Sequence, residues 1–218
     1  MERIARFGLL GIVLAAALAL VSCAGSGSGG ERESAEPEDE MKGMDASEML
    51  MENGEYSDER FIDAMAPHHQ GAVEMAEVAL EKAEHPELRQ LAENVVSTQR
   101  AEIEELRSIK EEEFGDPELP AEMDSEEMEM MGMTENPEEL ANQEPFDEAF
   151  IGEMIPHHES AIEMARTANE ESYNPRIQDL STRIIEAQQR EIEQMREWRQ
   201  EWYPGASCSE AGKPPEEG

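Results

Sequence analysis

The chain contains the same sequence unit twice, and this duplication constrains its fold more than any other feature. A segment that begins at Phe61 returns at Phe150, and the offset of 89 positions then stays constant. Residues 58–107 match residues 147–196 at 21 of 50 positions without an insertion. Chance does not produce such a match, so the chain is an internal duplication of a unit of about fifty residues. Any chemistry that the unit carries should therefore occur in two related copies.

Each copy has the hydrophobic periodicity of a helical hairpin. In the first copy, apolar residues recur at steps of three and four over residues 61–80 and again over residues 88–106, with Pro86 between the two stripes. The second copy repeats the pattern around Pro175. Two hairpins with one apolar face each can bury it only against each other. The sequence therefore predicts an all-α four-helix bundle.

One proline interrupts the first helix of each copy. Pro67 and Pro156 both stand directly before a pair of histidines. A proline inside a helix removes a hydrogen bond and crowds the carbonyl four residues back, which predicts a kink at this point. In one alternative the helix begins at the proline. In another, one imidazole of the pair binds the carbonyl that the proline leaves free.

Four of the five histidines form two adjacent pairs at equivalent positions of the copies. Residues three and four apart share one face of a helix, so a methionine lies over each pair, and a second methionine lies two turns beyond it. Imidazole nitrogen and thioether sulfur suit Cu(I) and Ag(I), and imidazole with carboxylate suits Cu(II). Packing in the core is the alternative role of these methionines. The predicted metal ligands are His68, His69, Met65, Met75, His157, His158, Met154 and Met164.

The second helix of each copy adds polar residues to its apolar stripe. Gln99 and Glu102 share one face of the first such helix, and Gln188 and Glu191 occupy the equivalent positions in the second copy. A buried amide needs partners. We expect these four side chains to fix the orientation and tautomer of the imidazoles. For the two glutamates, a solvent-facing position is an equally open alternative.

Methionine is also dense outside the predicted helices. Packing does not explain methionine in flexible polar segments, and clusters of methionine among acids are similar to the methionine motifs of extracytoplasmic copper carriers. We expect an auxiliary, weaker store of Cu(I) or Ag(I) there, and little loss of stability if residues 119–140 are deleted. The auxiliary cluster comprises Met123, Met128, Met130, Met131 and Met133, and four more methionines precede the bundle at Met41, Met44, Met49 and Met51.

The N-terminus has the features of a bacterial lipoprotein signal. Arg3 and Arg6 precede an apolar run that is too short to span a bilayer comfortably, and the run ends in Leu-Val-Ser before Cys23. Cys23 is the predicted lipidated first residue of the mature chain. An ordinary signal peptide or an uncleaved anchor is the alternative. In each case the protein leaves the cytoplasm, and a lipid is its predicted membrane contact. The other cysteine, Cys208, has no role that the sequence defines.

Composition divides the chain into segments. Residues 1–22 are the predicted signal peptide, and residues 23–56 a flexible acidic tether. Residues 57–203 form the predicted bundle, with repeats at 57–112 and 146–203 and a Met-rich acidic linker at 113–145. Residues 204–218 are a predicted disordered tail.

The formal net charge of −36 argues against one class of partner. Nothing in so acidic a chain would neutralise phosphate, which makes a nucleic acid or an anionic membrane surface an unsuitable ligand. Solubility accounts for the acidity, and a polyanionic surface would also concentrate cations near the histidines.

The motif around the histidines resembles a known bacterial family. Phe-x-x-x-Met-x-x-His-His-x-x-Ala-hydrophobic-x-Met-Ala, followed by Gln-x-x-Glu-Ile, covers nearly all of residues 58–203 in its two copies. It is similar to domain of unknown function 305 (DUF305). The resemblance implies a ferritin-like bundle, secreted or lipid-anchored, with copper or silver binding in some members. The eight His and Met ligands named above match the positions of the motif, whereas the long Met-rich linker departs from compact members.

The sequence favours an extracytoplasmic copper-binding lipoprotein that buffers, sequesters or delivers the metal without catalysis. One alternative is a ferritin-like di-iron oxidase or a cupric reductase. A di-iron site needs Glu-x-x-His, but Met65 and Met154 stand three residues before His68 and His157. A second alternative is a structural surface protein whose His and Met side chains are core. A partner protein that receives the metal is not defined by the sequence.

Overall fold

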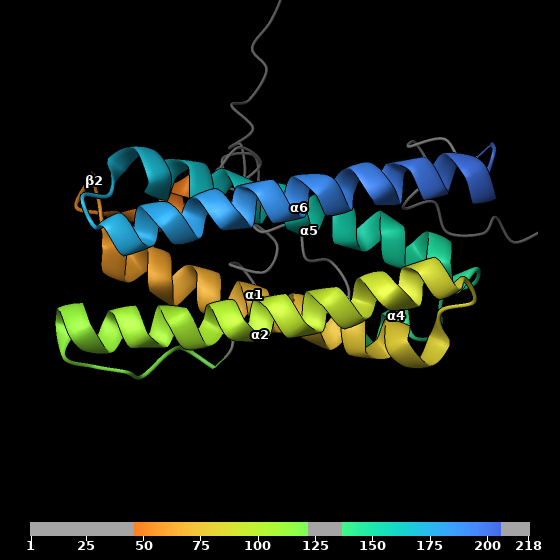
Figure 1. Cartoon of the computed structure of the whole chain (residues 1–218), viewed down its shortest axis with the longest axis horizontal. Helices are drawn as coiled ribbons and strands as arrows, with labels where there is room; N and C mark the ends of the chain where they lie inside the picture. The colour runs from red at the N-terminus through yellow and green to blue at the C-terminus, as the bar shows by residue number, and fades with distance from the viewer. Residues whose placement is uncertain (1–45, 122–136, 206–218) are drawn as a thin grey trace, which may run out of the picture. The chain divides into compact units, whose positions relative to one another are not determined.

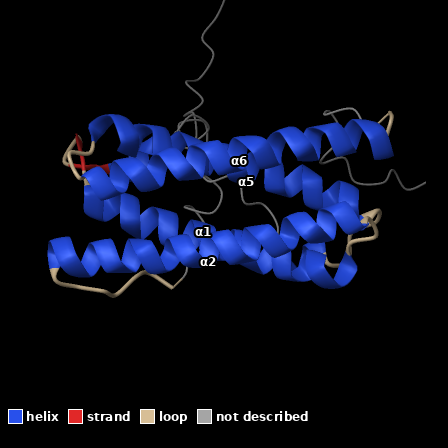
Figure 2. Cartoon of the chain, in the orientation of Figure 1, coloured by secondary structure: helices blue, strands red, loops and turns tan. Residues whose placement is uncertain are grey.

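Four long helices make up most of the computed structural model, which describes residues 46–121 and 137–205 (Figures 1 and 2). The helices are α1 (Asp58–Lys82), α2 (Pro86–Phe114), α5 (Phe146–Glu171) and α6 (Pro175–Trp202). The predicted all-α four-helix bundle is therefore confirmed. Shorter elements precede α1 and α5: η2 (Ala46–Leu50), β1 (Met51–Glu52), β2 (Glu55–Tyr56) and α4 (Pro137–Leu140).

The two sequence copies form two helical hairpins that pack on each other. Helix α1 lies along α2, and α5 lies along α6. Helix α1 also packs against α5, and the two run in opposite directions, as the colours of Figure 1 show. Because equivalent helices cross antiparallel, the middle of α1 meets the middle of α5. The histidine pairs stand at this crossing.

Local sequence signals fix the ends of the helices. Ser57 is the N-cap of α1 and its side chain accepts a hydrogen bond from the amide of Arg60. Asn174 caps α6 in the same way, at 2.9 Å from the amide of Arg176. Helix α2 ends at Gly115, whose φ of 75° lies in the left-handed region that glycine adopts without strain.

The start of α2 is capped from the other hairpin. The carboxylate of Asp147, which is fully buried, accepts hydrogen bonds from the amides of Glu84 at 3.0 Å and His85 at 2.8 Å. It also accepts from Nδ1 of His85 at 2.7 Å, and the ring of His85 stacks on Trp202. The negative charge lies where the N-terminal dipole of α2 favours it. Asp147 therefore joins α5 to α2 at one end of the bundle.

Both internal prolines are accommodated within continuous helices. Pro67 lies inside α1 and Pro156 inside α5. The alternative in which the helix begins at the proline is therefore wrong. The second alternative is also wrong: in the described region the Nε2 atoms of His68 and His69 contact side chains, and their Nδ1 atoms have no hydrogen-bond partner.

The folded region begins earlier than the sequence predicts. The flexible tether was expected to extend to residue 56, but Ala46 and Leu50 are buried in the core, and the partly buried Met49 packs against it. Strands β1 and β2 then form a short antiparallel hairpin around Asn53-Gly54. Both turn residues have positive φ, which is the conformation that an Asn-Gly hairpin turn requires.

The predicted linker also contributes to the core. Leu140, at the end of α4, is 1% exposed and packs among the core residues of α1, α2 and α5. Leu119 is half-buried against the core, and Nζ of the buried Lys110 holds the same stretch by donating to the carbonyl of Glu118 at 2.8 Å. The expectation that residues 119–140 contain no core residue is therefore wrong. One or two apolar side chains in an acidic stretch leave no periodic signal, which is why the sequence pattern misses them.

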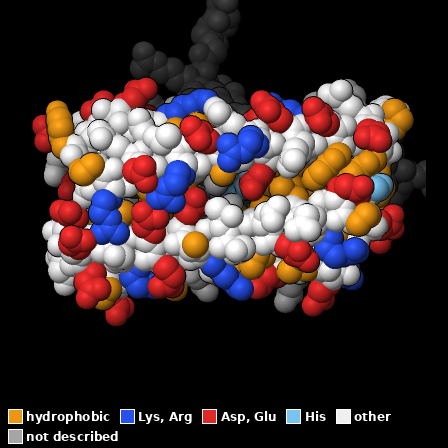
Figure 3. Space-filling model, in the orientation of Figure 1, with side chains coloured by type: hydrophobic (Ala, Val, Ile, Leu, Met, Phe, Trp, Pro, Cys, Tyr) orange, Lys and Arg blue, Asp and Glu red, His pale blue; other side chains and the backbone are white. Residues whose placement is uncertain are grey.

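Charged side chains of both signs cover the face on which α2 and α6 lie (Figure 3). Nη2 of Arg183 in α6 donates to both carboxylate oxygens of Glu105 in α2, at 2.8 and 2.9 Å. Arg176 contacts Glu112 at 2.6 Å. Exposed pairs of this kind contribute about 0 to 1 kcal/mol each. They align the two hairpins, but the buried core supplies most of the stability.

The core is divided into two hydrophobic clusters. One cluster contains the C-terminal half of α1, the N-terminal half of α5 and the adjoining parts of α2 and α6. The other contains the N-terminal half of α1, the C-terminal half of α5, and η2. The boundary between them lies where α1 crosses α5. The core is therefore interrupted at the level of the histidine pairs.

Several predicted features lie outside the described residues. These are the signal peptide at residues 1–22, Cys23, the auxiliary cluster of Met123, Met128, Met130, Met131 and Met133, and Cys208 in the predicted tail. Among the residues that the structure does describe, none of the helices is long and apolar enough to cross a membrane.

Candidate metal centre

Four histidines meet in one buried layer between the two hydrophobic clusters. His68 and His69 come from α1, and His157 and His158 from α5. Their side chains are 0 to 1% exposed. The ring centroids of His68 and His157 lie 3.9 Å apart, and the two rings within each pair lie 6.3 Å apart. Antiparallel crossing of equivalent helices thus brings both predicted pairs together. We call these four residues the histidine layer.

Two glutamates of the second helices bind the outer histidines of the layer. Nε2 of His69 lies 2.9 Å from a carboxylate oxygen of Glu102, and Nε2 of His158 lies 2.7 Å from Glu191. The glutamate side chains are only 6% and 16% exposed, so neither points freely into solvent. A carboxylate only accepts, so each Nε2 carries a hydrogen, and in the neutral ring each Nδ1 then keeps its lone pair. This carboxylate–imidazole arrangement orients histidines that bind metals.

Among the residues that the structure describes, the free nitrogens of the layer have no hydrogen-bond partner. Nδ1 of His68, His69 and His158 is buried and unpaired, and so are both ring nitrogens of His157. Leaving one buried polar atom unpaired costs about 1 to 3 kcal/mol. Five such atoms in one layer are therefore unfavourable for a structure that uses them only for packing. A ligand that accepts electron pairs from nitrogen would satisfy them.

The predicted glutamines border the same layer but make no hydrogen bond to its imidazoles among the described residues. Gln99 and Gln188 are each 3% exposed, and neither the amide oxygen nor the amide nitrogen of either side chain has a hydrogen-bond partner among the described residues. They stand one turn before Glu102 and Glu191, on the helix face that carries those glutamates. Their unpaired amides add four more polar atoms that a hydrated or metal-loaded layer would satisfy.

The two central histidines are held neutral. Burial lowers the pKa of His68 well below its ordinary value, and positive charge on His157, His69 or His158 would lower it further. Burial also lowers the pKa of His157, and positive charge on His158 or His69 would act in the same direction. The backbone carbonyl of the opposite histidine works against each shift but does not outweigh burial. Neutral imidazole is the form that binds metals.

The four predicted methionines are buried and flank the layer in mixed pairs. Met65 of the first copy and Met164 of the second lie in one hydrophobic cluster, and Met75 and Met154 lie in the other. Along the helix axis, Met65 is about 4.5 Å from His68, and Met75 is about 10.5 Å from it in the opposite direction. Each side of the layer therefore carries one thioether from each copy.

No ready-made site with three His, Cys, Asp or Glu ligands is present in the described residues. Methionine sulfur is outside that set of ligand types. The layer fits a soft ion that accepts few ligands of nitrogen and sulfur, and fits poorly an ion that needs several carboxylates. The layer has four imidazoles with two carboxylates, whereas a di-iron carboxylate site is rich in glutamate.

Sequence reasoning missed one residue of the layer. Oγ of Ser160 lies 2.8 Å from Nε2 of His68, across the α1–α5 contact. The equivalent residue in the first copy is Gly71. Reasoning from the repeat selects positions that the copies share, and this position differs between them. A small hydroxyl three residues after the first histidine of a pair is the available signal.

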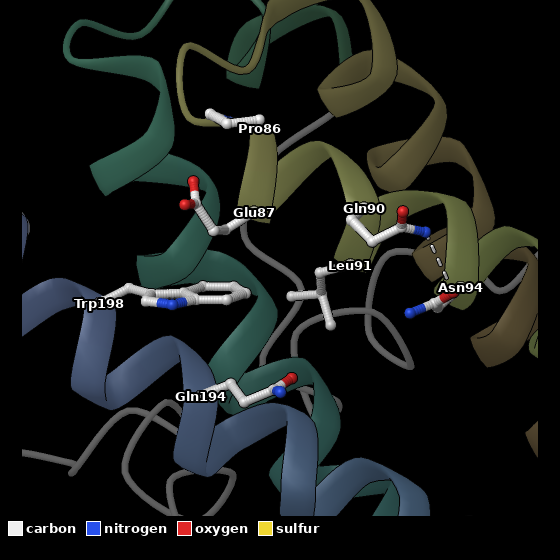
Figure 4. Close-up of a pocket in the computed structure, with 7 residues that line it drawn as sticks. All are labelled: Pro86, Glu87, Gln90, Leu91, Asn94, Gln194 and Trp198. Carbon is white, nitrogen blue, oxygen red and sulfur yellow. Dashed lines mark hydrogen bonds between the residues drawn. The ribbon is translucent and has the colours of Figure 1, made fainter.

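A surface pocket of about 400 Å³ lies apart from the layer. It is formed between the N-terminal part of α2 and the C-terminal part of α6, with Leu91 and the ring of Trp198 facing each other across it (Figure 4). Gln90 and Asn94, joined by a hydrogen bond, border it on the α2 side. Its lining contains no histidine, cysteine or methionine, so it offers no soft ligand.

Comparison with known proteins agrees with this geometry. The family model described as "Domain of unknown function (DUF305)" matches residues 22–110 and 58–199. The chain belongs to the DUF305 family. The resemblance of the histidine motif to this family is thereby confirmed. A curated protein of Acanthamoeba polyphaga mimivirus, uncharacterized protein L153, is 33% identical over 55 residues, and this match spans 36% of the viral protein.

Among solved structures, this DUF305 protein is similar to CopM. The Cu(II)-bound form of CopM is 41% identical, with a TM-score of 0.63, over 68% of this chain and 99% of CopM. CopM structures in Cu(I)-bound, Ag-bound and apo forms match as well. A DUF305 fragment from Deinococcus radiodurans is 25% identical with a TM-score of 0.58, over 64% of this chain and 93% of the fragment. The match spans nearly the whole length of CopM and of the Deinococcus fragment.

Proposed function

We propose that this DUF305 protein binds copper, and with it silver, in the histidine layer and its flanking methionines. The observation that carries the proposal is the set of five buried ring nitrogens without a partner, in a layer whose outer imidazoles are oriented by Glu102 and Glu191. Unpaired nitrogens of neutral imidazoles are available to bind a metal ion. CopM, which is similar over two thirds of this chain, has been crystallised with both copper oxidation states and with silver.

The ligand types suit both oxidation states of copper. The imidazoles serve either state, and the carboxylates beside them make the ligating nitrogens more basic. The thioethers of Met65, Met75, Met154 and Met164 prefer the monovalent ions Cu(I) and Ag(I). Thioether does not form disulfides, which suits an oxidising compartment outside the cytoplasm. The layer and its methionines would therefore offer suitable ligands to both oxidation states of copper.

The biological role that follows is buffering, sequestration or delivery of copper outside the cytoplasm. The lipoprotein signal ending at Cys23 would anchor the chain at the membrane, with residues 24–45 between the lipid and the folded bundle. Metal bound inside a helical bundle is shielded from reaction with solvent. Release to a partner protein then requires the two hairpins to move relative to each other at the α1–α5 contact, where the histidine layer lies.

Metal titration tests the proposal. The chain is titrated with Cu(I), Ag(I), Cu(II) and Zn(II) against chelators of known affinity, while circular dichroism follows the helices. We expect tight binding of Cu(I), Ag(I) and Cu(II), and weaker binding of Zn(II), because copper ranks above zinc for such ligands. If the chain binds Zn(II) as tightly as Cu(II) and does not bind Ag(I), the proposed preference for copper and silver is wrong. Absence of binding by every ion would leave a structural role for the histidines and methionines.

A further inference from the structure

The two halves of the histidine layer differ at one residue. Ser160 follows His157 by three positions in α5, whereas Gly71 occupies the same place after His68 in α1. Oγ of Ser160 donates to the backbone carbonyl of His157 at 2.8 Å. The same oxygen lies 2.8 Å from Nε2 of His68. Gly71 has no hydroxyl to make the reciprocal contact with His157.

The hydroxyl of Ser160 determines which nitrogen of His68 carries the hydrogen. A hydroxyl has one hydrogen, and that of Ser160 is used on the carbonyl of its own helix. Oγ therefore accepts the contact with His68, and Nε2 of His68 must donate. A neutral imidazole has one N–H, so Nδ1 of His68 bears a lone pair. This Nδ1 is buried without a partner, as a free ligand atom would be.

His157 differs from the other three rings of the layer in its hydrogen-bond partners. Glu102 and Glu191 fix His69 and His158 with Nε2–H and a free Nδ1. Among the described residues, neither nitrogen of His157 has a partner within hydrogen-bond geometry, although the backbone carbonyl of His68 lies near enough to oppose the lowering of the pKa of His157. Three rings of the layer are thus held in one tautomer, and the fourth is held in none.

We infer that Ser160 is a positioning residue that fixes His68 with Nδ1 free, so that the two halves of the layer are inequivalent metal sites. The inference about the metal rests on the proposed function, whereas the tautomer does not. A ring already held in its ligating form loses less freedom on binding. The half that contains His68 therefore binds the first monovalent ion more tightly than the half that contains His157.

The tautomers are measured without any metal. Long-range ¹H–¹⁵N NMR of the apo full chain distinguishes Nε2–H from Nδ1–H in each histidine. We expect His68, His69 and His158 as Nε2–H, and His157 as an averaged mixture. Ser160→Ala should shift His68 toward a mixture and leave His69 and His158 unchanged. Ser160→Thr, which keeps the hydroxyl, should retain the wild-type pattern. His68 found as Nδ1–H, or unmoved by Ser160→Ala, would overturn the inference.

The inequivalence is measured with Ag(I), which is diamagnetic, by following the same ring signals during titration. Orienting groups of metal ligands contribute about 10- to 100-fold in affinity. In the wild type, the His68 signals should respond first. Ser160→Ala should weaken that step by about this factor, and Gly71→Ser should bring the His157 step closer to it. Equal response of both halves in the wild type would overturn the inequivalence. If no ring signal responds to Ag(I) while the apo tautomers are as expected, the proposed function fails and the positioning role of Ser160 stands.

Discussion

The ring centroids of His68 and His157 lie 3.9 Å apart, although 88 residues separate the two histidines in the sequence. Antiparallel crossing of two equivalent helices places the same residue of each copy at the contact. A duplicated unit with one histidine pair thereby yields a single layer of four imidazoles. The layer replaces apolar packing in the middle of the bundle, at a cost that metal binding would offset.

Loss of the layer should abolish specific copper binding. Substituting His68, His69, His157 and His158 by alanine should reduce copper affinity at least tenfold, which is more than about 1.4 kcal/mol. The pair His69→Gln and His158→Gln keeps the side-chain volume nearly constant, in case the alanine variant does not fold. Chelator competition gives the affinity. His85→Ala removes an imidazole outside the layer and should bind copper normally. If a variant without the histidine layer is still helical and binds copper with wild-type affinity, the alternative of a structural surface protein is favoured.

Thioether ligation should distinguish monovalent from divalent copper. Replacing Met65 and Met164 by leucine should weaken Cu(I) and Ag(I) binding and leave Cu(II) binding nearly unchanged, because thioether is a soft ligand. Leucine has a similar volume, so the loss of stability should stay below about 1.5 kcal/mol. Met195→Leu is the matched control, since Met195 is buried in the core and its counterpart in the first copy is Leu106. If Met195→Leu weakens Ag(I) binding equally, the effect comes from packing.

The helices and the histidine pairs could be predicted because their signals are local and occur twice. Apolar spacing defines each helix, and the offset between copies shows which residues are equivalent. The state of each imidazole depends on distant partners: Glu102 stands 33 positions from His69, and Ser160 stands 92 positions from His68. Such contacts arise only when the hairpins pack. Leu50 and Leu140 are missed for a related reason, because each lies in a short segment without apolar periodicity and its burial depends on tertiary structure.

Acid should destabilise the metal-free protein through the central histidines. Burial lowers the pKa of His68 and His157 below the ordinary value of 6.5. Below about pH 6.5 the unfolded chain therefore takes up protons that the folded layer excludes, and the free energy of unfolding falls. The loss approaches about 1.4 kcal/mol per ring for each pH unit. Urea unfolding at pH 7 and pH 5 should show a smaller difference for the His68→Gln, His157→Gln variant than for the wild type. An equal difference would mean that other groups cause the acid sensitivity.

The contact of Asp147 with the turn before α2 should contribute measurably to stability. Asp147→Ala leaves the amides of Glu84 and His85 without their acceptor, and a hydrogen bond to a charged group contributes about 1.5 to 3 kcal/mol. Thermal unfolding of the metal-free protein should show a loss in this range. Asp58 occupies the equivalent position in the first copy, and one of its carboxylate oxygens is buried without a partner. Asp58→Ala should therefore cost less, and a greater loss there would contradict the assigned role of Asp147.

The methionine-rich linker should store monovalent metal without supporting the fold. The deletion must be confined to residues 122–136, because the wider range of 119–140 would remove Leu140 from the core and Leu119 from its edge. The narrower deletion still removes Met123, Met128, Met130, Met131 and Met133. The sequence predicts a flexible segment here, and thioethers in such a segment would lose chain entropy on binding, so these sites should be weak and selective for Cu(I) and Ag(I).

Silver stoichiometry by mass spectrometry should therefore fall in the deletion variant, while the ring signals of the histidine layer respond to Ag(I) as in the wild type. Thermal stability should change little, since no residue of the described core is lost. The matched variant replaces the same five methionines by serine and keeps the length of the chain. If it binds as much silver as the wild type, the linker is no metal store. If the serine variant retains the fold and the deletion variant does not, residues 122–136 act as a spacer whose length the bundle requires.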